Sequence, residues 1–382
     1  MKKNLVVIFG SRSTEHDISI LTALQVMSVA DKSKYNVIPT YISQTGKWYT
    51  GKALLDTDFY KNFDIKKVKE VAVLPCDNFL YIKKFGKFKR LQKIDCVIVS
   101  CHGKNGEDGT LQGLFELAQI PYSSAGVFAS SVGLDKQKMK EIFVANNIPI
   151  CDYKVITKND FENKKFDFES VQFPVVVKPN SLGSSIGISV CDDLEKLKEA
   201  LQLVFCFDSI ALIETCVQNL KEVNISVLGN QEDVICSVTE EPLSKGLLSF
   251  DKKYLKSTTK CQPNGTKNGM QNLDRVIPAN ITKRQERIIK DLAIKIFKAT
   301  NSRGVVRIDF MIDTETNKIY ANEINTIPGS FAFYLWEKSG ISFPKLIDRL
   351  VEIAEDSKKS NDKLTTTFVS CVLSGTNINL QK

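Results

Sequence analysis

The chain has 382 residues, of which 43% are hydrophobic and 25% charged, a globular composition long enough for two or three domains. No apolar run approaches the roughly 20 residues that span a bilayer, and the apolar segment near the N-terminus is too short for a secretory signal. We therefore expect a cytoplasmic protein without a membrane partner. The ten cysteines form no Cys-x-x-Cys pair and only two histidines are present, which disfavours a zinc site and a disulfide framework. The net charge of +8 comes mostly from dispersed lysines and predicts a solvated basic surface rather than a nucleic-acid partner.

Apolar strands and helices alternate along the first part of the chain. The expected strands are Leu5–Gly10, Val37–Ile42 and Cys96–Ser100, and the expected helices are Ile18–Ala30 and Thr110–Ala118. This alternation predicts a layered α/β domain around a parallel sheet. The segment Trp48–Arg90 is irregular and rich in lysine, and its pattern assigns no element.

The rest of the chain contains further helices, strands and two irregular segments. The expected helices are Asp135–Asn147, Leu194–Val204, Lys283–Thr300 and Phe343–Ala354, and the expected strands are Val175–Lys178, Ser185–Val190, Ile210–Glu214, Glu222–Leu228, Asp233–Val238, Val305–Ile312 and Lys318–Asn325. Leu247–Ile277 has no hydrophobic periodicity and predicts a mobile loop. Asp356–Lys363 predicts a polar linker, and Thr365–Leu373 predicts a last edge strand.

The first motif is KPNSLGSSIG at residues 178–187, where a strand delivers Lys178 into a loop of small residues. Small side chains let successive backbone N–H groups approach phosphate oxygens and form an anion nest. The motif is not a Walker A loop, because Gly-Lys-Ser/Thr is absent and a strand follows. An ordinary hairpin turn is the alternative interpretation.

The second motif lies on the expected strands Val305–Ile312 and Lys318–Asn325. The second of these strands runs into the sequence ANEINTIPG, which ends at Gly329. Alternation along a strand places Arg307 on the same face as Asp309, and Glu323 on the same face as Asn325. If the strands pair through their short turn, these four groups converge. Carboxylate and amide oxygens suit Mg²⁺, which commonly also binds substrate phosphates. The alternative is a solvated ion pair between Arg307 and Glu323.

Two more polar loops follow the first and third expected strands, where open α/β sheets bind ligands. The loop FGSRSTEHD contains Glu15, and the loop SCHGKNGEDG contains His102 and three glycines that favour close backbone approach. Glu15 could contact a ligand, or it could stabilise the following helix through the helix dipole. His102 could act as a pH switch, although a packed histidine is the commoner case.

Together these motifs resemble the D-alanine–D-alanine ligase family of the ATP-grasp superfamily. The likeness covers roughly Lys3–Ala354, and HGKNGEDGTLQGLFELAQIPY and RIDF…NEINTIPG are its most specific parts. The resemblance implies an α/β fold with three domains. These are an N-terminal donor-substrate domain at 1–130, a central ATP-grasp subdomain with the phosphate loop at 131–222, and a C-terminal ATP-grasp subdomain at 223–358. A polar linker and tail follow at 359–382.

The resemblance also implies the ATP and metal sites. The ATP residues it identifies are Lys136, Lys178, Gly183, Ser185, Gly187, Glu214, Val217 and Glu222. The two lysines would hold phosphates, Glu214 would lie by the adenine and Glu222 would hold the ribose. The Glu214-to-Glu222 spacing is one residue longer than usual. Asp309, Glu323 and Asn325 would bind two Mg²⁺ ions, which Mn²⁺ can replace.

The catalytic residues implied by the resemblance are Glu15, Ser184, Tyr254, Arg307 and Gly329. Glu15 would bind the donor ammonium and form a hydrogen-bonded set with Ser184 and Tyr254. Arg307 and the Gly329 N–H would form the oxyanion pocket. The implied substrate-binding residues are His102, Lys253, Ser330 and Tyr334.

The implied reaction joins two D-alanines through an acyl phosphate made from ATP, for peptidoglycan and cell-wall synthesis. The family also suggests a homodimer. One departure concerns the acceptor, because Tyr334 stands where most members have a serine that touches it. The alternatives are therefore a ligase that uses D-serine or D-lactate as acceptor, and an inactive ATP-binding paralogue. In one interpretation, the Tyr334 ring points into the acceptor pocket and favours a small acceptor such as D-alanine. In the other, SFAFYLW packs as core and Lys253 and Ser330 hold the acceptor carboxylate. Because the segment is mostly apolar, we expect the second outcome.

Overall fold

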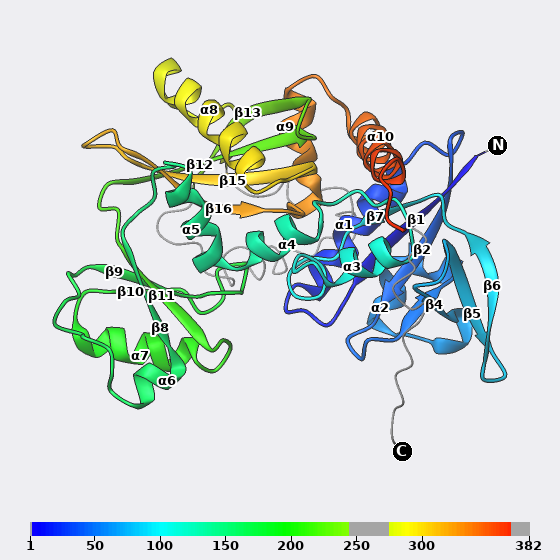
Figure 1. The fold of residues 1–382 in the computed structure, drawn as a ribbon, viewed down its shortest axis with the longest axis horizontal. Coiled ribbons are helices and arrows are strands. Elements are labelled where there is room, and N and C mark those ends of the chain that lie inside the picture. The colour runs from blue at the N-terminus through cyan, green and yellow to red at the C-terminus, as the bar shows by residue number, and fades with distance from the viewer. Residues whose placement is uncertain (1, 244–274, 368–382) are drawn as a thin grey trace, which may run out of the picture.

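The computed structural model describes residues 2–243 and 275–367, in which three sheets form three lobes (Figure 1). The N-terminal lobe is built on a seven-stranded sheet in the order β6-β5-β4-β3-β2-β1-β7. Its strands are β1 Lys3–Gly10, β2 Tyr35–Ile42, β3 Trp48–Thr50, β4 Lys69–Val73, β5 Phe79–Lys84, β6 Lys87–Lys93 and β7 Cys96–Val99. Its helices are α1 His16–Val29, η1 Lys52–Leu55, α2 Thr57–Lys61, η2 Ile65–Lys67 and α3 Thr110–Leu117.

The parallel core of this lobe was predicted, but its antiparallel half was not. Strands β2, β1 and β7 are parallel, which confirms the expected α/β layer. The unassigned segment Trp48–Arg90 forms η1, α2, η2, β3, β4, β5 and most of β6, and its strands extend the sheet in antiparallel fashion. Strand β6 is almost wholly exposed, so it lacks the alternation that marks a half-buried strand.

The central lobe carries a four-stranded antiparallel sheet in the order β10-β9-β11-β8. Its elements are β8 Tyr153–Thr157, α6 Lys158–Glu162, β9 Val175–Pro179, β10 Ser189–Cys191, α7 Leu194–Val204 and β11 Ile210–Thr215, and helices α4 Val127–Leu134 and α5 Lys136–Ala145 precede them. The expected strand Ser185–Val190 is wrong in its first part, because β10 begins only at Ser189. Ser184, Ser185 and Gly187 all have positive φ, which is turn geometry.

The C-terminal lobe carries a five-stranded sheet in the order β14-β13-β12-β15-β16. Its elements are β12 Leu220–Gly229, β13 Val234–Pro242, β14 Arg275–Val276, α8 Lys283–Ala299, β15 Gly304–Asp313, β16 Ile319–Asn325, η5 Gly329–Ala332, α9 Phe333–Lys338 and α10 Phe343–Asp362. Most of the predicted loop Leu247–Ile277 lies outside the described residues, and Arg275–Val276 within it forms β14.

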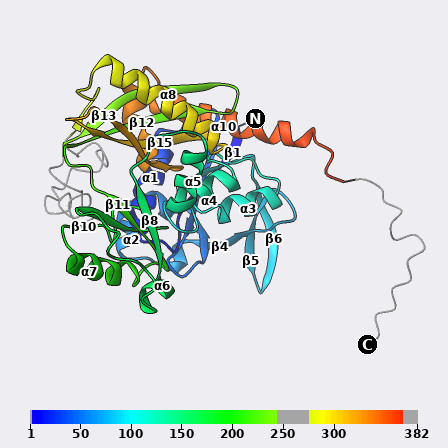
Figure 2. The ribbon, with the colours of Figure 1, turned by 60° about the vertical axis from the view of Figure 1, so that its left-hand side comes forward.

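Helix α10 overturns the prediction of a linker at Asp356–Lys363, because the helix continues to Asp362. Ion pairs of Lys358 with Asp362 and of Lys359 with Asp356 follow helical spacing and stabilise this polar end. Figure 2 shows the last turns projecting beyond the lobes, so they lack the apolar face by which a helix is recognised. Of the expected strand Thr365–Leu373, residues 365–367 have no regular structure and the rest lies outside the described residues.

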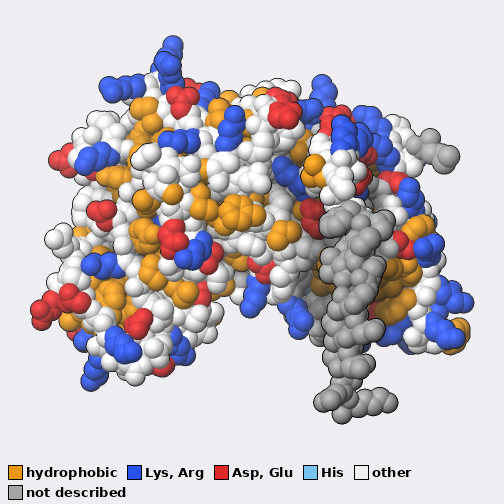
Figure 3. Space-filling model, in the orientation of Figure 1, with side chains coloured by type: hydrophobic (Ala, Val, Ile, Leu, Met, Phe, Trp, Pro, Cys, Tyr) orange, Lys and Arg blue, Asp and Glu red, His pale blue; other side chains and the backbone are white. Residues whose placement is uncertain are grey.

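One hydrophobic core joins the beginning and the end of the folded chain. Residues of β1 and β7 pack in the same buried cluster as α9 and the first half of α10, including Trp336 and Leu350. Separate clusters stabilise the central sheet and the C-terminal sheet. Among the helices in the described ranges, none combines the length and hydrophobicity needed to cross a bilayer. Figure 3 shows the surface hollowed between the central lobe and the N-terminal lobe, with Lys and Arg side chains along the border.

Candidate active site

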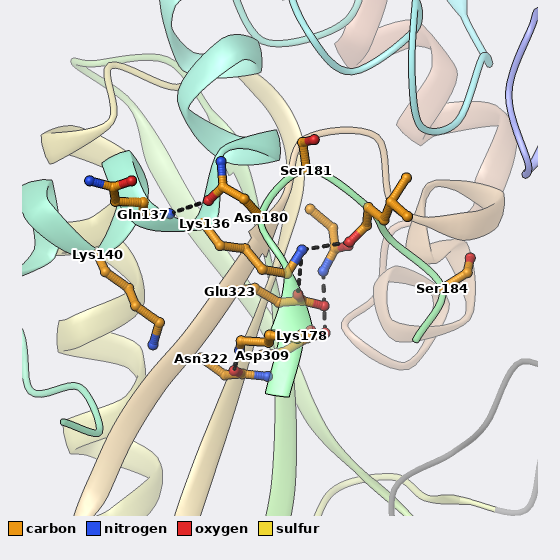
Figure 4. A network of polar contacts seen from close by, with 12 residues as sticks. Lys136, Gln137, Lys140, Lys178, Asn180, Ser181, Ser184, Asp309, Asn322 and Glu323 are labelled. Carbon is orange, nitrogen blue, oxygen red and sulfur yellow. Dashed lines mark hydrogen bonds and ion pairs between the residues drawn. The ribbon is translucent and has the colours of Figure 1, made fainter. Parts of the chain in front are cut away.

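The Lys136 side chain extends from the start of helix α5 to the C-terminal sheet. It is the first residue of α5, which begins where Asp135 caps the backbone N–H of Lys138. Its Nζ donates to the Leu182 carbonyl at 2.6 Å and lies 3.8 Å from Glu323 Oε2 (Figure 4). Burial lowers the pKa of Lys136, while Glu323 acts in the opposite direction. The predicted phosphate lysine and metal carboxylate are therefore neighbours.

Lys178 lies on β9 beside β11, where it pairs in register with Leu212. Its Nζ lies 2.7 Å from Glu214 Oε1 and donates to Asn322 Oδ1 at 3.1 Å. The fully buried Lys140 approaches the same Glu214 oxygen at 3.2 Å. Burial acts to raise the pKa of Glu214, but the two lysines outweigh it and lower the pKa. Sequence reasoning missed Lys140, whose spacing of one helical turn from Lys136 was the available signal.

Asn322 also escaped prediction, and a β-bulge explains its position. Asp309 pairs with Glu323 and Phe310 pairs with Ala321, so Asn322 is an extra residue on β16. A bulge can turn such a side chain to the opposite face of a strand. Asn322 thereby reaches Lys178 while Glu323 faces Lys136, as Figure 4 shows.

The loop after β9 meets the start of α1. Ser184 Oγ donates to Glu15 Oε1, which joins two of the three predicted triad residues across the lobes. Gly103 has a φ of 69°, which favours glycine, and a Cβ there would lie 2.6 Å from Glu15 Oε2; a Cβ on Gly183 would make a tight contact of 3.1 Å with the same oxygen. Ser185 and Gly187 continue the same turn with positive φ.

Strands β15 and β16 pair antiparallel, as predicted, and place their four polar residues on one face. Arg307 donates to both oxygens of Asp309 at 2.7 Å, and Asn325 Nδ2 donates to Asp309 Oδ2 at 3.2 Å. Burial acts to lower the pKa of Arg307, but Asp309 outweighs it and raises the pKa. Within the described part of the chain, Arg307 thus forms its ion pair with Asp309 and not the alternative solvated pair with Glu323.

The donor set at these strands suits a hard cation. Asp309 and Glu323 face each other in register, and the Asn325 amide lies in the same group. In the described ranges, no cluster of three or more His, Cys, Asp or Glu side chains could hold a metal by itself. Two carboxylates and an amide fit Mg²⁺ that completes its coordination with phosphate oxygens and water.

His102 is buried beneath the start of α1. Its Nε2 lies 2.8 Å from Thr22 Oγ1, and its backbone N–H donates to Ser19 Oγ at 2.9 Å. Burial lowers the pKa of His102 to about 4, against a hydrogen bond to the Ile327 backbone. The ring is therefore neutral near pH 7, which favours a packed, orienting histidine over a switch in that range.

The turn after Gly329 is conformationally unusual. Ser330, Phe331 and Ala332 have φ values of 52°, 54° and 50°, in the left-handed region that bulky residues rarely adopt. Ser330 is held by α1, where its Oγ donates to Gln25 Oε1 at 2.5 Å and its N–H donates to Thr22 Oγ1 at 3.3 Å. Tyr334 is buried and its hydroxyl donates to Glu240 Oε1 at 2.9 Å. The expectation that SFAFYLW packs as core agrees with the burial of Phe331 through Trp336.

The remaining predicted residues divide into two groups. Glu222 lies on β12 two residues before Asn224 and therefore faces the same side as Asn224, and Val217 lies between β11 and β12. Lys253 and Tyr254 lie outside the described residues, so the predicted triad and acceptor site are described without them.

Lys136 and Lys178 face Glu323 and Asn322 of the C-terminal sheet, and a loop of the central lobe contacts Glu15 at the start of α1 in the N-terminal lobe. This three-lobed α/β arrangement defines an ATP-grasp ligase. The family model described as D-ala D-ala ligase N-terminus matches residues 4–125, and the one described as D-ala D-ala ligase C-terminus matches residues 142–352. The chain belongs to the D-alanine–D-alanine ligase family.

Individual relatives are similar in sequence to this chain over nearly its whole length. The D-alanine--D-alanine ligase of Thermosipho melanesiensis is 39% identical and covers 92% of this chain and 93% of its own. That of Acetivibrio thermocellus is 36% identical and covers 95% and 98%. Among solved structures, the VanG D-Ala:D-Ser ligase from Enterococcus faecalis has a TM-score of 0.78 at 28% identity and covers 93% of this chain and all of its own. The D-alanine-D-alanine ligase from Coxiella burnetii has a TM-score of 0.76 at 26% identity and covers 95% and 96%.

Proposed function

We propose that this chain uses ATP to join two D-alanines into D-alanyl-D-alanine, for peptidoglycan precursors made in the cytoplasm. The observation that carries the proposal is the approach of Lys136 on α5 to Glu323 on β16, beside the contact of Lys178 with Asn322. Two lysines meet a carboxylate and an amide of β16 there, and phosphoryl transfer uses such cations together with a bound metal to offset phosphate charge. The family resemblance supports a homodimer, which light scattering after gel filtration tests.

In the first step, a carboxylate oxygen of the donor D-alanine attacks the γ-phosphorus of ATP. An O–P bond forms, the bond to the β-phosphate oxygen breaks, and ADP leaves. Lys136 and Lys178 offset the phosphate charge, and the loop at 183–187 offers backbone N–H groups. Asp309, Glu323 and Asn325 would hold Mg²⁺, which supplies Lewis-acid charge neutralisation.

In the second step, the free amine of the acceptor attacks the carbonyl carbon of the acyl phosphate. A C–N bond forms, the C–O bond to phosphate breaks, and the proton lost by the amine leaves with the departing inorganic phosphate. Arg307 and the Gly329 N–H meet the negative charge of the tetrahedral intermediate, and losing one such donor costs about 3–4 kcal/mol in the transition state. Glu15, oriented by Ser184, binds the donor ammonium, while Thr22 and Ser19 of α1 hold His102 in place.

A panel of acceptors tests the proposal. The purified chain is incubated with ATP, Mg²⁺ and D-alanine, and ADP release is measured against a blank without amino acid. The same assay is run with added D-serine or D-lactate, and products are identified by mass spectrometry. D-Alanyl-D-alanine as the main product is expected. D-Alanine-independent ADP release, or none, would favour an inactive paralogue, and a mixed product would identify another acceptor.

A further inference from the structure

Two consecutive residues of β16 contact the two lysines proposed to hold the ATP phosphates. Asn322 Oδ1 accepts from Lys178 Nζ at 3.1 Å, and Glu323 Oε2 lies 3.8 Å from Lys136 Nζ (Figure 4). Consecutive side chains of a regular strand point to opposite faces, and the bulge that inserts Asn322 lifts this restriction. The bulge therefore lets β16 present two neighbouring acceptors to the central lobe.

Lys178 is buried between acceptors that belong to two different lobes. Glu214 on β11 of the central lobe lies 2.7 Å from its Nζ, and Asn322 belongs to the C-terminal lobe. Only 5% of Lys178 is exposed, and a buried ammonium needs partners for its charge and its N–H groups. The four-carbon stem of lysine is flexible, so the direction of Nζ is fixed only by the acceptors around it. Glu214 holds Lys178 within its own sheet, and Asn322 ties the same Nζ to the C-terminal sheet.

The uncharged amide of Asn322 suits a lysine that binds phosphate. An ammonium has three N–H donors, and among the described residues Glu214 and Asn322 engage two of them. The third can donate to a phosphate oxygen. Glu214 already divides its charge between Lys178 and Lys140, which lies 3.2 Å from the same oxygen. A second carboxylate at position 322 would neutralise Lys178 and repel phosphates, whereas an amide orients the ammonium and leaves its charge available.

We propose that Asn322 is a positioning residue for nucleotide phosphates, because its side-chain oxygen holds the Lys178 ammonium between the central and C-terminal lobes. The inference rests on the proposed use of ATP. Asn322 acts through Lys178, so its loss weakens binding of the phosphate groups and not of the adenine and ribose. A residue that only stabilised the fold would change the affinity for both parts of the nucleotide alike.

Binding of ligands with and without phosphates tests this role. The full chain is titrated with ADP and with adenosine by isothermal titration calorimetry, without Mg²⁺ so that the proposed metal site does not contribute. The adenosine Kd divided by the ADP Kd measures the phosphate contacts. We expect Asn322→Leu, which fills a similar volume without an acceptor, to lower this ratio about tenfold while the adenosine Kd changes less than twofold. Asn322→Asp should lower the ratio at least as much and leave Tm unchanged or higher, because its carboxylate pairs with Lys178 and repels phosphate.

The chain offers a matched control at Asn36 on β2 of the N-terminal lobe. Its Nδ2 donates to Asn4 Oδ1 at 2.9 Å, so Asn36→Leu also removes an asparagine hydrogen bond but should leave the ratio within twofold of the wild-type value. A ratio lowered less than threefold by Asn322→Leu refutes the positioning role. If Asn322→Leu does not fold, Asn322→Asp decides by the same criterion. A wild-type chain that binds ADP no more tightly than adenosine refutes the proposed use of ATP itself, which is a distinct result.

Discussion

Glu107 joins the loop after β7 to the loop after β16 through the backbone of Ile327. The Ile327 N–H donates to Glu107 Oε1 at 2.8 Å, while the Gly103 N–H donates to Oε2 at 2.8 Å. The Glu107 side chain therefore orients both Gly103, which follows His102, and the segment from Ile327 to Gly329. Burial and the charge of Glu15 raise the pKa of Glu107 to about 8, against the two backbone hydrogen bonds that lower it.

Replacing Glu107 with alanine should loosen the segment from Ile327 to Gly329, whose last N–H is proposed for the oxyanion pocket. Two buried backbone N–H groups would lose their acceptor, which we expect to lower the free energy of unfolding by about 2–4 kcal/mol. We also expect kcat to fall at least tenfold while the KM for ATP changes less than threefold, because the proposed ATP-binding residues are untouched. Urea unfolding and steady-state kinetics measure both. Glu199→Ala, at an exposed position on α7, is the control. An unchanged kcat would show that Glu107 does not position the loop.

The buried His102 should make the protein sensitive to acid. The pKa of His102 is lowered from 6.5 to about 4, so between these pH values the unfolded chain binds a proton that the native ring does not. Its contribution to stability is fully present above pH 6.5 and is lost as pH falls towards 4, amounting to about 3 kcal/mol.

His102→Gln should remove this dependence. The free energy of unfolding is measured by urea titration at several pH values between 4 and 7 for both proteins. The difference between the two curves should shrink towards low pH, because only the wild type loses the histidine contribution. If the unfolding free energies of the two proteins changed in parallel with pH, the His102 ring would be protonated to the same extent in the native and the unfolded chain. Glu199→Gln should retain the wild-type slope.

The pairing of β15 with β16 could be predicted, but their sheet neighbours could not. Period-two alternation and a short turn were enough to place Arg307 and Asp309 opposite Glu323 and Asn325. Asn224 pairs with both Asp309 and Glu240 only because β12 lies between β13 and β15, and strand order is a tertiary property. Asn322 was hidden for a different reason, since alternation without the bulge would point it away from Lys178.

Buried lysines pose a related difficulty. Lys140 lies in the sequence KQKMKE, which reads as a solvated helix face, and Lys138 in that stretch is indeed exposed. Only tertiary contacts with Glu214 on β11 and the ring of Tyr153 on β8 bury Lys140. From the sequence alone, such lysines are expected on the protein surface, because lysine is rarely buried without a partner.

Lys140→Met should therefore change ATP binding more than stability. Lys140 has an ion pair with Glu214 but no well-aligned hydrogen bond among the described residues, and burial lowers its pKa. Methionine fills similar volume without a desolvated charge, and Glu214 retains Lys178. We expect the KM for ATP to rise about fivefold, equivalent to about 1 kcal/mol, with Tm unchanged or higher. Lys138→Met, on the exposed face of the same helix, is the matched control. A large fall in Tm with an unchanged KM would assign Lys140 a purely structural role.

Glu323→Gln tests the proposed metal site most directly. The amide preserves the shape and the strand pairing with Asp309, but it removes one of the two carboxylates expected to hold Mg²⁺ and weakens the attraction for Lys136. We expect kcat to fall at least a thousandfold, or about 4 kcal/mol, because charge neutralisation by the metal contributes several kcal/mol to phosphoryl transfer. Circular dichroism and Tm should stay near the wild-type values. Binding of Mn²⁺ in the presence of ATP, followed by electron paramagnetic resonance, should weaken in parallel with activity. Glu315→Gln, on the exposed turn of the same hairpin, should behave as wild type. A folded Glu323→Gln protein with near-normal turnover at ordinary Mg²⁺ concentrations would rule out Glu323 as a metal ligand.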